Sequence, residues 1–148
     1  MGNSKQGSEV VAVIDTNVFV PAVAGREPEC RFYNGAIRRC WKVVISEFIR
    51  QEYEQVIVEY GFRPDVIIHE LHKLYAMNKY RVSNANPDEI GEELAPRKDR
   101  HIVAPCREIA NLIVTHDRGI IERKGRILSE TRALVMTLAE AQAKLEAP

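Results

Sequence analysis

Apolar runs and helical-period stripes alternate along the chain. The run at residues 10–14 is uninterrupted and rich in β-branched side chains, which is typical of a strand buried on both faces in the middle of a parallel sheet. Shorter runs predict further strands at residues 42–45, 80–83 and 112–115. The pattern also predicts a last short strand at residues 126–129.

The segments between these strands have the spacing of helices, in which apolar residues recur every three or four positions. Ser46 is a favoured helix N-cap, and Glu47 after it suits the positive end of the helix dipole. Gly61 ends that helix, and Pro64 fits the first turn of the next. We expect helices at residues 17–23, 29–40, 46–60, 65–77, 99–110, 119–122 and 131–146. This alternation predicts an α/β fold with a mostly parallel sheet and helices on both faces.

The chain length of 148 residues suits one domain with one core. We expect residues 1–9 to form a loose polar tail and residues 10–148 to form the domain. Residues 84–98, rich in Asn, Pro, Glu and Gly, form the longest irregular connection, and long connections are often functional or mobile.

The amino-acid composition excludes few functional classes of protein. The chain is 45% hydrophobic and 28% charged, as in ordinary globular proteins. Basic and acidic residues balance at 21 each, so net charge does not advertise a nucleic-acid partner, although an acidic pocket can offset a basic rim. Three cysteines without a C-x-x-C motif indicate neither a disulfide framework nor a zinc knuckle, and they favour a reducing cytoplasm. No apolar run approaches the ~18 residues of a membrane span.

Two acids follow predicted strands. Asp15 ends the strand at residues 10–14, and Asp117 lies two residues beyond the run at residues 112–115. The carboxyl ends of parallel strands open onto one edge of the sheet, where α/β folds bind their ligands. The alternative for each acid, taken alone, is an ordinary turn or helix-capping residue.

Two further acids lie on helix faces that are otherwise apolar. Glu52 falls between Phe48 and Val56 within the apolar stripe of its helix, with Glu59 near the edge of that stripe as the second candidate. Asp99 precedes the apolar stripe of the next candidate helix. Alone, Glu52 is explained by a buried ion pair and Asp99 by a helix cap.

The set of four acids is harder to explain by structure alone. Carboxylates that converge on one sheet edge repel each other, and divalent cations relieve that repulsion. Hard cations such as Mg²⁺ or Mn²⁺ prefer oxygen ligands. The histidines and cysteines form no set with the spacing of a zinc site.

These residues resemble the PIN-domain nucleases, and most closely the PIN-family toxins of toxin-antitoxin systems, which are relatives of the VapC toxins. The resemblance runs from residue 10 to about residue 139, and each segment alone is weakly specific, whereas all in order are strongly specific. The segments are VIDTNVFV at 13–20, VISE at 44–47, EYEQV at 52–56, KDRHIV at 98–103 and IVTHD at 113–117.

The resemblance implies a three-layer, Rossmann-like or flavodoxin-like α/β/α domain that cuts single-stranded RNA with Mg²⁺ or Mn²⁺. It implies that bound metal orients and deprotonates a water and neutralises charge on the phosphate. The implied acidic set is Asp15, Glu52, Asp99 and Asp117. Asp15 and Asp99 are the expected main metal ligands and Asp117 a further one, while Glu52 and Asp117 act directly or through ordered water. The implied supporting polar residues are Thr16, Asn17, Ser46 and Thr115.

The sequence departs from the family pattern around Asp99. The segment before Asp99 is often acidic in the family, but here it is basic, and Arg100 replaces another frequent acid. Pro105 lies inside the predicted helix, where an interior proline costs about 3 kcal/mol, so we expect a late start or a kink. The candidate RNA contacts are Arg97, Lys98, Arg100 and Arg118, for which solvated surface charge is the equal alternative.

Other functions remain open at this point. An aspartate-based phosphatase of the haloacid dehalogenase type needs an acid where this chain has Asn17. An RNA-binding or protein-binding module without catalysis is disfavoured by the intact acidic set, and a nuclease of RNA maturation or decay is a further alternative. The resemblance also implies a small antitoxin protein and a homodimer. Four apolar residues could supply the surface of the dimer, and the alternative is that they belong to the core. They are Val66, Ile67, Leu71 and Leu74.

Overall fold

A computed structural model describes residues 9–148 of the chain, so the loose tail predicted for residues 1–9 lies almost entirely outside the described residues. Five strands form a single sheet in the order β3-β2-β1-β4-β5, and every neighbouring pair is parallel. The strands are β1 (Val11–Ile14), β2 (Lys42–Ile45), β3 (Tyr80–Val82), β4 (Leu112–Val114) and β5 (Leu134–Met136). The predicted parallel α/β fold is therefore confirmed.

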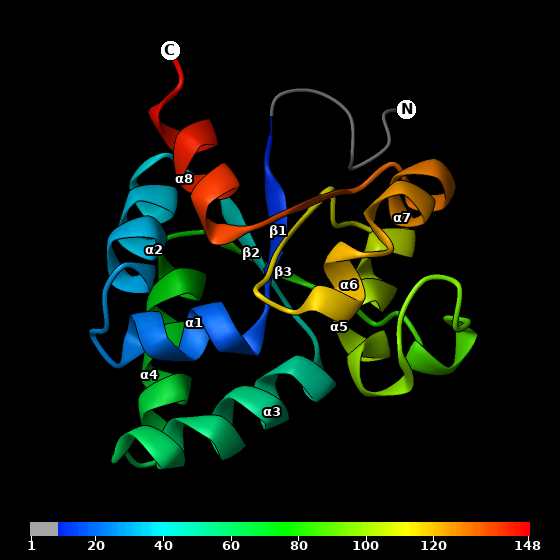
Figure 1. The fold of residues 1–148 in the computed structure, drawn as a ribbon. Helices are drawn as coiled ribbons and strands as arrows, with labels where there is room; N and C mark the ends of the chain where they lie inside the picture. Colours follow the sequence, from blue (N-terminus) through cyan, green and yellow to red (C-terminus); the bar gives the residue numbers. More distant parts are fainter. Residues whose placement is uncertain (1–8) are drawn as a thin grey trace.

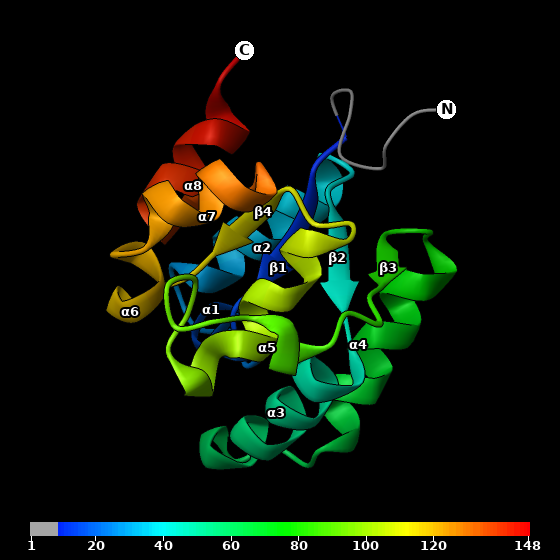
Figure 2. The same ribbon diagram turned by 90° about the vertical axis from the view of Figure 1, so that its right-hand side faces the viewer.

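Helices cover both faces of the sheet, which gives three layers. Figure 1 shows α1, α2 and α4 on one side of the strands and α5, α6 and α7 on the other, and the turned view in Figure 2 agrees. Helix α3 lies beyond the carboxyl end of β2. The helices are α1 (Thr16–Val23), α2 (Glu29–Arg38), α3 (Glu47–Ile57), α4 (Asp65–Ala76), α5 (Arg100–Val103), α6 (Arg118–Ile121), α7 (Lys124–Thr131) and α8 (Leu138–Glu146).

The core fixes α1 and α3 against the central strand. Phe19 and Tyr53 are both fully buried, and their rings stack with centroids 4.1 Å apart and an interplanar angle of 8°. The hydroxyl of Tyr53 donates a hydrogen bond to the backbone oxygen of Ile14, at the carboxyl end of β1. Because Ile14 immediately precedes Asp15, this packing holds the carboxyl edge of the sheet and α3 in a fixed relation.

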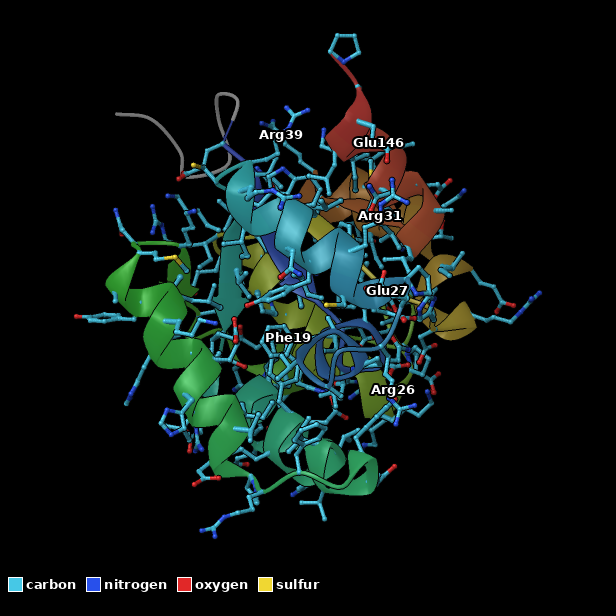
Figure 3. The ribbon with its side chains drawn as sticks, turned by 90° about the vertical axis from the view of Figure 1, so that its left-hand side faces the viewer. Phe19, Arg26, Glu27, Arg31, Arg39 and Glu146 are labelled. Atoms are coloured by element: carbon cyan, nitrogen blue, oxygen red, sulfur yellow. The ribbon has the colours of Figure 1, made fainter. Side chains whose placement is uncertain are left out.

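Helices α2 and α8 contact each other at the end of the molecule opposite the carboxyl edge of the sheet (Figure 1). Arg31 on α2 lies 3.5 Å from Glu146 on α8, and Arg39 donates to the backbone oxygen of Leu145. Figure 3 shows Arg31 and Glu146 side by side between these two helices. Both contacts hold the C-terminal helix α8 against α2, on the side of the molecule away from the carboxyl edge of the sheet (Figure 1).

After residue 123 the prediction of a strand followed by one long helix is wrong, because the structure has a helix, a strand and a second helix. Residues 126–129, predicted as a strand, lie within helix α7, where Ile127 and Thr131 are buried four positions apart, as helical spacing requires. The predicted helix at residues 131–146 is instead strand β5 followed by α8. A capping box of Thr137 and Glu140 starts α8, and this T-x-x-E signal is visible in the sequence.

The predicted helix at residues 99–110 is also shorter than expected. Helix α5 has a single turn, and a 3-10 turn at Ala104–Arg107 replaces the rest. Pro105 explains the change, since proline has no N–H to donate and its ring clashes with the preceding helical turn. The long connection at residues 84–98 is anchored by the buried side chains of Ile90 and Leu94.

Three of the four residues considered for a dimer surface belong to the core. Ile67, Leu71 and Leu74 of α4 are buried, and only Val66 is partly exposed. This face of α4 therefore packs into the core of the domain, which was the alternative to a dimer surface. No helix within residues 9–148 has the length and apolar character needed to cross a bilayer.

Candidate active site

Asp15 lies where β1 ends and α1 begins, and only 5% of its surface is exposed. Its backbone N–H continues the sheet by donating to the oxygen of Val114 at 2.9 Å. Its Oδ1 accepts from the backbone N–H of Thr16 at 2.7 Å, and its Oδ2 accepts from the hydroxyl of Thr115 at 2.6 Å. The strand-end position predicted for Asp15 is confirmed, and both carboxylate oxygens are held.

The surroundings of Asp15 penalise its negative charge. Burial is the main cause that raises its pKa from 3.8 to about 6. The hydrogen bonds from Thr115 and Thr16 lower the pKa, but the nearby charges of Glu52 and Asp99 raise it further. A cation beside Asp15 would oppose this shift, because it would stabilise the buried carboxylate and offset the charges of Glu52 and Asp99.

Glu52 projects from α3 toward Asp15. Its Oε1 accepts a hydrogen bond from the hydroxyl of Thr16 and lies 2.7 Å from Nε2 of His101. Burial would raise the pKa of Glu52, but the hydrogen bonds from His101 and Thr16 hold it below its ordinary value. Burial likewise opposes the charged form of His101, but Glu52 raises the pKa of that imidazole above its ordinary value. The pair is therefore stabilised as carboxylate and imidazolium.

His101 was not among the residues predicted for the site. No spacing in the sequence points to it, because its partner Glu52 lies 49 positions away on another helix. Only the packing of α5 against α3 brings the two side chains together.

Asp99 and Asp117 lie on either side of the Lys98 ammonium group. The Nζ of Lys98 is 3.2 Å from Oδ2 of Asp99 and 2.9 Å from Oδ2 of Asp117. Asp99 is buried at the start of α5, and Asp117 caps α6 by accepting from the backbone N–H of Gly119 at 2.7 Å. One cationic group thus joins two carboxylates from separate segments.

The pKa values of these two acids shift in opposite directions. Burial raises the pKa of Asp99, and the charge of Asp117 adds to the increase, although Lys98 opposes it. Burial would also raise the pKa of Asp117, but hydrogen bonds from Lys98 and Gly119 hold it below its ordinary value. Hydrogen bonds to Asp117 and Asp99 raise the pKa of Lys98. Asp117 is therefore favoured as the charged carboxylate, whereas Asp99 takes up a proton more readily.

Gly119 allows the two acidic segments to approach each other. A Cβ at this position would lie 2.9 Å from Cγ of Pro96 and 3.0 Å from Oδ1 of Asp117. Contacts this short require a neighbour to move. The absence of a side chain at Gly119 therefore lets the segment before Lys98 pack against the start of α6.

A continuous chain of polar contacts links all four predicted acids. Thr115 connects Asp15 to Asp117, because its hydroxyl donates to Asp15 and accepts from the backbone N–H of Asp117 at 2.8 Å. In order along the network, the residues are Glu52, Thr16, Asp15, Thr115, Asp117, Lys98 and Asp99. We call these seven residues the carboxylate network. They come from four separate stretches of the chain.

The other two supporting residues have structural contacts. The exposed Asn17 accepts at Oδ1 from the backbone N–H of His116 at 3.2 Å, which ties the first turn of α1 to the segment after β4. Ser46 is buried and caps α3 by accepting from the N–H of Ile49 at 3.1 Å. The second candidate acid, Glu59, is exposed in the 3-10 turn Val58–Tyr60.

The predicted RNA contacts are of three kinds. Arg97 and Arg118 are exposed next to the acids. Lys98 is exposed but is bonded to Asp99 and Asp117. Arg100 is partly buried, and its Nε is buried without a hydrogen-bond partner within the described part of the chain.

The carboxylates suit a divalent cation in their chemistry. They supply the oxygen donors that Mg²⁺ and Mn²⁺ prefer. Burial is the main cause that raises the pKa values of Asp15 and Asp99, neighbouring carboxylates add to it, and a cation would favour the charged form of both. The Lys98 ammonium already stands as a cation between Asp99 and Asp117. In residues 9–148 no three His, Cys, Asp or Glu side chains have the spacing of a ready-made metal site. The donors therefore suit a divalent cation by their chemistry, whereas their spacing, with Lys98 between Asp99 and Asp117, is not that of a formed metal site.

The chain matches a known protein family. Residues 11–119 match the family model described as "PIN domain", and this span contains the whole carboxylate network. No curated protein and no solved structure matches the chain significantly.

Proposed function

The chain belongs to the PIN domain family, whose members are generally nucleases, and from this premise we propose that it is a metal-dependent endoribonuclease that cleaves single-stranded RNA. The observation that carries the proposal is the convergence of Asp15, Glu52, Asp99 and Asp117 at the carboxyl edge of the parallel sheet. This edge is the usual ligand site of open α/β sheets.

The metal ligands that we propose are Asp15, Asp99 and Asp117. A bound Mg²⁺ or Mn²⁺ ion supplies Lewis-acid stabilisation of charge on the phosphate and lowers the pKa of water. Thr16 and Thr115 hold the two oxygens of Asp15 in place and so fix its orientation. Such preorganised groups matter because a small misplacement of reacting groups lowers the rate strongly.

The remaining polar residues position charge around the phosphate. His101 keeps Glu52 ionised and oriented, because it lies 2.7 Å from Oε1 and favours the carboxylate. Lys98 reaches the same region, so once released from Asp99 and Asp117 its ammonium group is available to the RNA phosphate. The reaction is hydrolysis, in which a water oxygen bonds to phosphorus while the bond to the leaving nucleoside oxygen breaks.

The biological role that we propose is that of the toxin in a type II toxin-antitoxin pair. The support is the resemblance of the motifs to PIN-family toxins, and a nuclease of RNA processing or decay is the alternative with the same chemistry. The proposal includes a cytoplasmic location, a small antitoxin partner and a homodimer. A small antitoxin segment would bind over Asp15 and block the site.

The chemistry is tested by cleavage of a labelled, structured RNA with Mg²⁺, Mn²⁺ or EDTA. Wild-type protein should cut only with metal, and Asp15→Asn should not cut. The matched control is Glu59→Gln, which removes an exposed acid outside the carboxylate network and should cut as wild type does. Equal cutting by wild type and Asp15→Asn would reject the proposed site.

The toxin role needs a separate measurement. Induced expression of the wild type should arrest growth, while Asp15→Asn should not. A small reading frame beside the gene should encode a protein that restores growth and binds the toxin. Metal-dependent cleavage without growth arrest would favour the RNA-processing role.

A further inference from the structure

A groove adjoins the carboxylate network on the side of α3. It lies between α3 and the 3-10 turn Pro87–Glu89, and its volume is about 390 Å³. Glu52 and His101 line its inner end, so the groove is continuous with the network. Its size is at the lower end of the roughly 300–1,000 Å³ range of small-molecule sites. The groove is therefore large enough for one planar ring system next to the acids.

One face of α3 supplies an aromatic ring to this groove. Phe48, Gln51 and Gln55 all line it, and their spacing of three and seven residues places them on one face of the helix. Phe48 is 53% exposed, whereas Ile49 and Tyr53 of the same helix are fully buried. An exposed aromatic face beside a polar groove is the kind of surface on which unpaired nucleobases stack.

The amide groups in the groove suit the edges of a base. Gln51 and Gln55 present side-chain amides from α3, and both are exposed. The Nε2 of Gln51 also donates to Oε2 of Glu47 at 3.2 Å, which leaves its Oε1 and a second N–H for a base. Across the groove, Asn86 uses its Oδ1 to accept from the N–H of Asp88 at 2.9 Å, which leaves its amide nitrogen as a donor. Side-chain amides both donate and accept, as do the Watson–Crick and Hoogsteen edges of bases.

The charge in the groove also suits a nucleotide. Arg97 lines it and is exposed, so its guanidinium group can neutralise a backbone phosphate. Asp88 lines the opposite wall, and a carboxylate can accept from an exocyclic amino group such as that of cytosine. The groove thus combines an aromatic face, amides, the cationic groups of Arg97 and His101 and the carboxylates of Asp88 and Glu52.

We propose that this groove is a nucleobase subsite for the nucleotide next to the scissile phosphate of single-stranded RNA. The proposal rests on the nuclease function proposed above and extends it to the recognition of one unpaired base. Phe48 stacks on the base, the amides of Gln51, Gln55 and Asn86 contact its edge, and Arg97 contacts the adjoining phosphate. A base inside a duplex cannot enter, because it is stacked and paired.

The test measures RNA binding apart from cleavage. Fluorescence anisotropy of a labelled 12-nucleotide single-stranded RNA is recorded in EDTA, with the matching duplex as a second probe. Phe48→Ala should bind the single strand about tenfold more weakly, as expected when one base–aromatic stack is lost. Phe48→Trp should bind as wild type does. The control is Phe62→Ala, which removes a phenylalanine that is 40% exposed and does not line the groove.

A second variant tests the phosphate contact. Arg97→Gln should weaken binding and reduce the magnitude of the slope of log K against log salt by about 0.7, the value for one phosphate contact to a single strand. Phe48→Ala should leave that slope unchanged, because stacking releases no counterion. Thermal melting of each variant should match that of wild type, since both side chains are exposed.

The outcomes separate this inference from the proposed function. If wild type binds the single strand and Phe48→Ala loses binding, the subsite stands even when no RNA is cut. If wild type cuts RNA and Phe48→Ala binds and cuts equally well, the subsite is wrong and the nuclease remains. Equal affinity of wild type for single strand and duplex, or no binding at all, also overturns the subsite and points to a protein partner for the groove.

Discussion

The Nζ of Lys98 lies 2.9 Å from Oδ2 of Asp117. The same nitrogen is 3.2 Å from Oδ2 of Asp99, so a positive charge of the protein occupies a position between two proposed metal ligands. The Lys98 side chain is 73% exposed, which means that its ammonium group can move into solvent at little cost. Lys98 would therefore compete with the proposed divalent cation for the same pair of carboxylates.

Replacement of Lys98 should strengthen metal binding. Lys98→Ala removes the competing charge, so the affinity for Mn²⁺ in the absence of RNA should rise by up to about fivefold, the scale of an exposed ion pair. Titration calorimetry with Mn²⁺ measures this change. The matched control is Lys73→Ala, because Lys73 is 69% exposed and pairs with Glu70 at 3.4 Å, away from the network. Weaker Mn²⁺ binding by Lys98→Ala would reject the competition.

Removal of the buried charge at Asp15 should stabilise the metal-free protein. The pKa of Asp15 is about 6 in the folded chain and 3.8 in the unfolded chain. Folding therefore takes up a proton between these values, and the free energy of unfolding falls as pH rises through that window. Asp15→Asn avoids the loss, so at pH 7 it should be more stable by about 1–3 kcal/mol, while the difference should vanish near pH 4. Urea unfolding in EDTA at both pH values checks this, and equal stability at pH 7 contradicts it.

The pair of Glu52 and His101 should couple in a pH-dependent manner. The pKa of His101 is raised, so its contribution is present below about 6.5 and is lost as pH rises through the folded value. The pKa of Glu52 is lowered, so its contribution is present above about 4.5 and is lost as pH falls through the folded value. A double-mutant cycle of Glu52→Gln and His101→Gln should give about 1 kcal/mol at pH ~5.5 and less at pH ~9. A coupling independent of pH would show that the pair is not ionic.

The close approach at Gly119 should make this position sensitive to a methyl group. Gly119→Ala places a Cβ against Pro96 and Asp117, so we expect a loss of about 1–3 kcal/mol in stability and weaker Mn²⁺ binding. The matched control is Gly125→Ala in helix α7, where a Cβ meets nothing within 4 Å. That variant should be neutral or gain up to about 1 kcal/mol from helix propensity. Equal effects of both changes would mean that the contact with Pro96 is unimportant.

The hydroxyl of Tyr53 should contribute to the stability of the sheet edge. Tyr53→Phe removes its hydrogen bond to Ile14 but keeps the stack on Phe19, so we expect a loss of about 1–2 kcal/mol. Chemical unfolding measures the loss. Retained stability would mean that the oxygen of Ile14 needs no partner from α3.

Local signals in the sequence were enough to predict the central strands and the acids that follow them. The β-branched run before Asp15 and the run before Asp117 are buried strands because strands inside a parallel sheet are apolar on both faces. The same reasoning failed for residues 126–129, where a short run with Ile127 fits either a strand or a helix. The T-x-x-E signal of Thr137 and Glu140, on which none of the predicted elements was based, marks the start of α8.

By itself the sequence determined the fold class, the family and the four acids, because strand burial, helix caps and motif order are written in neighbouring residues. The tertiary structure alone decided that His101 meets Glu52, that Lys98 stands between Asp99 and Asp117, and that Phe48 opens onto a groove. These relations join segments far apart in the chain. They arise from packing and from the directions of side chains. The local pattern of apolar and polar residues carries no information on the distance between side chains that are remote in sequence.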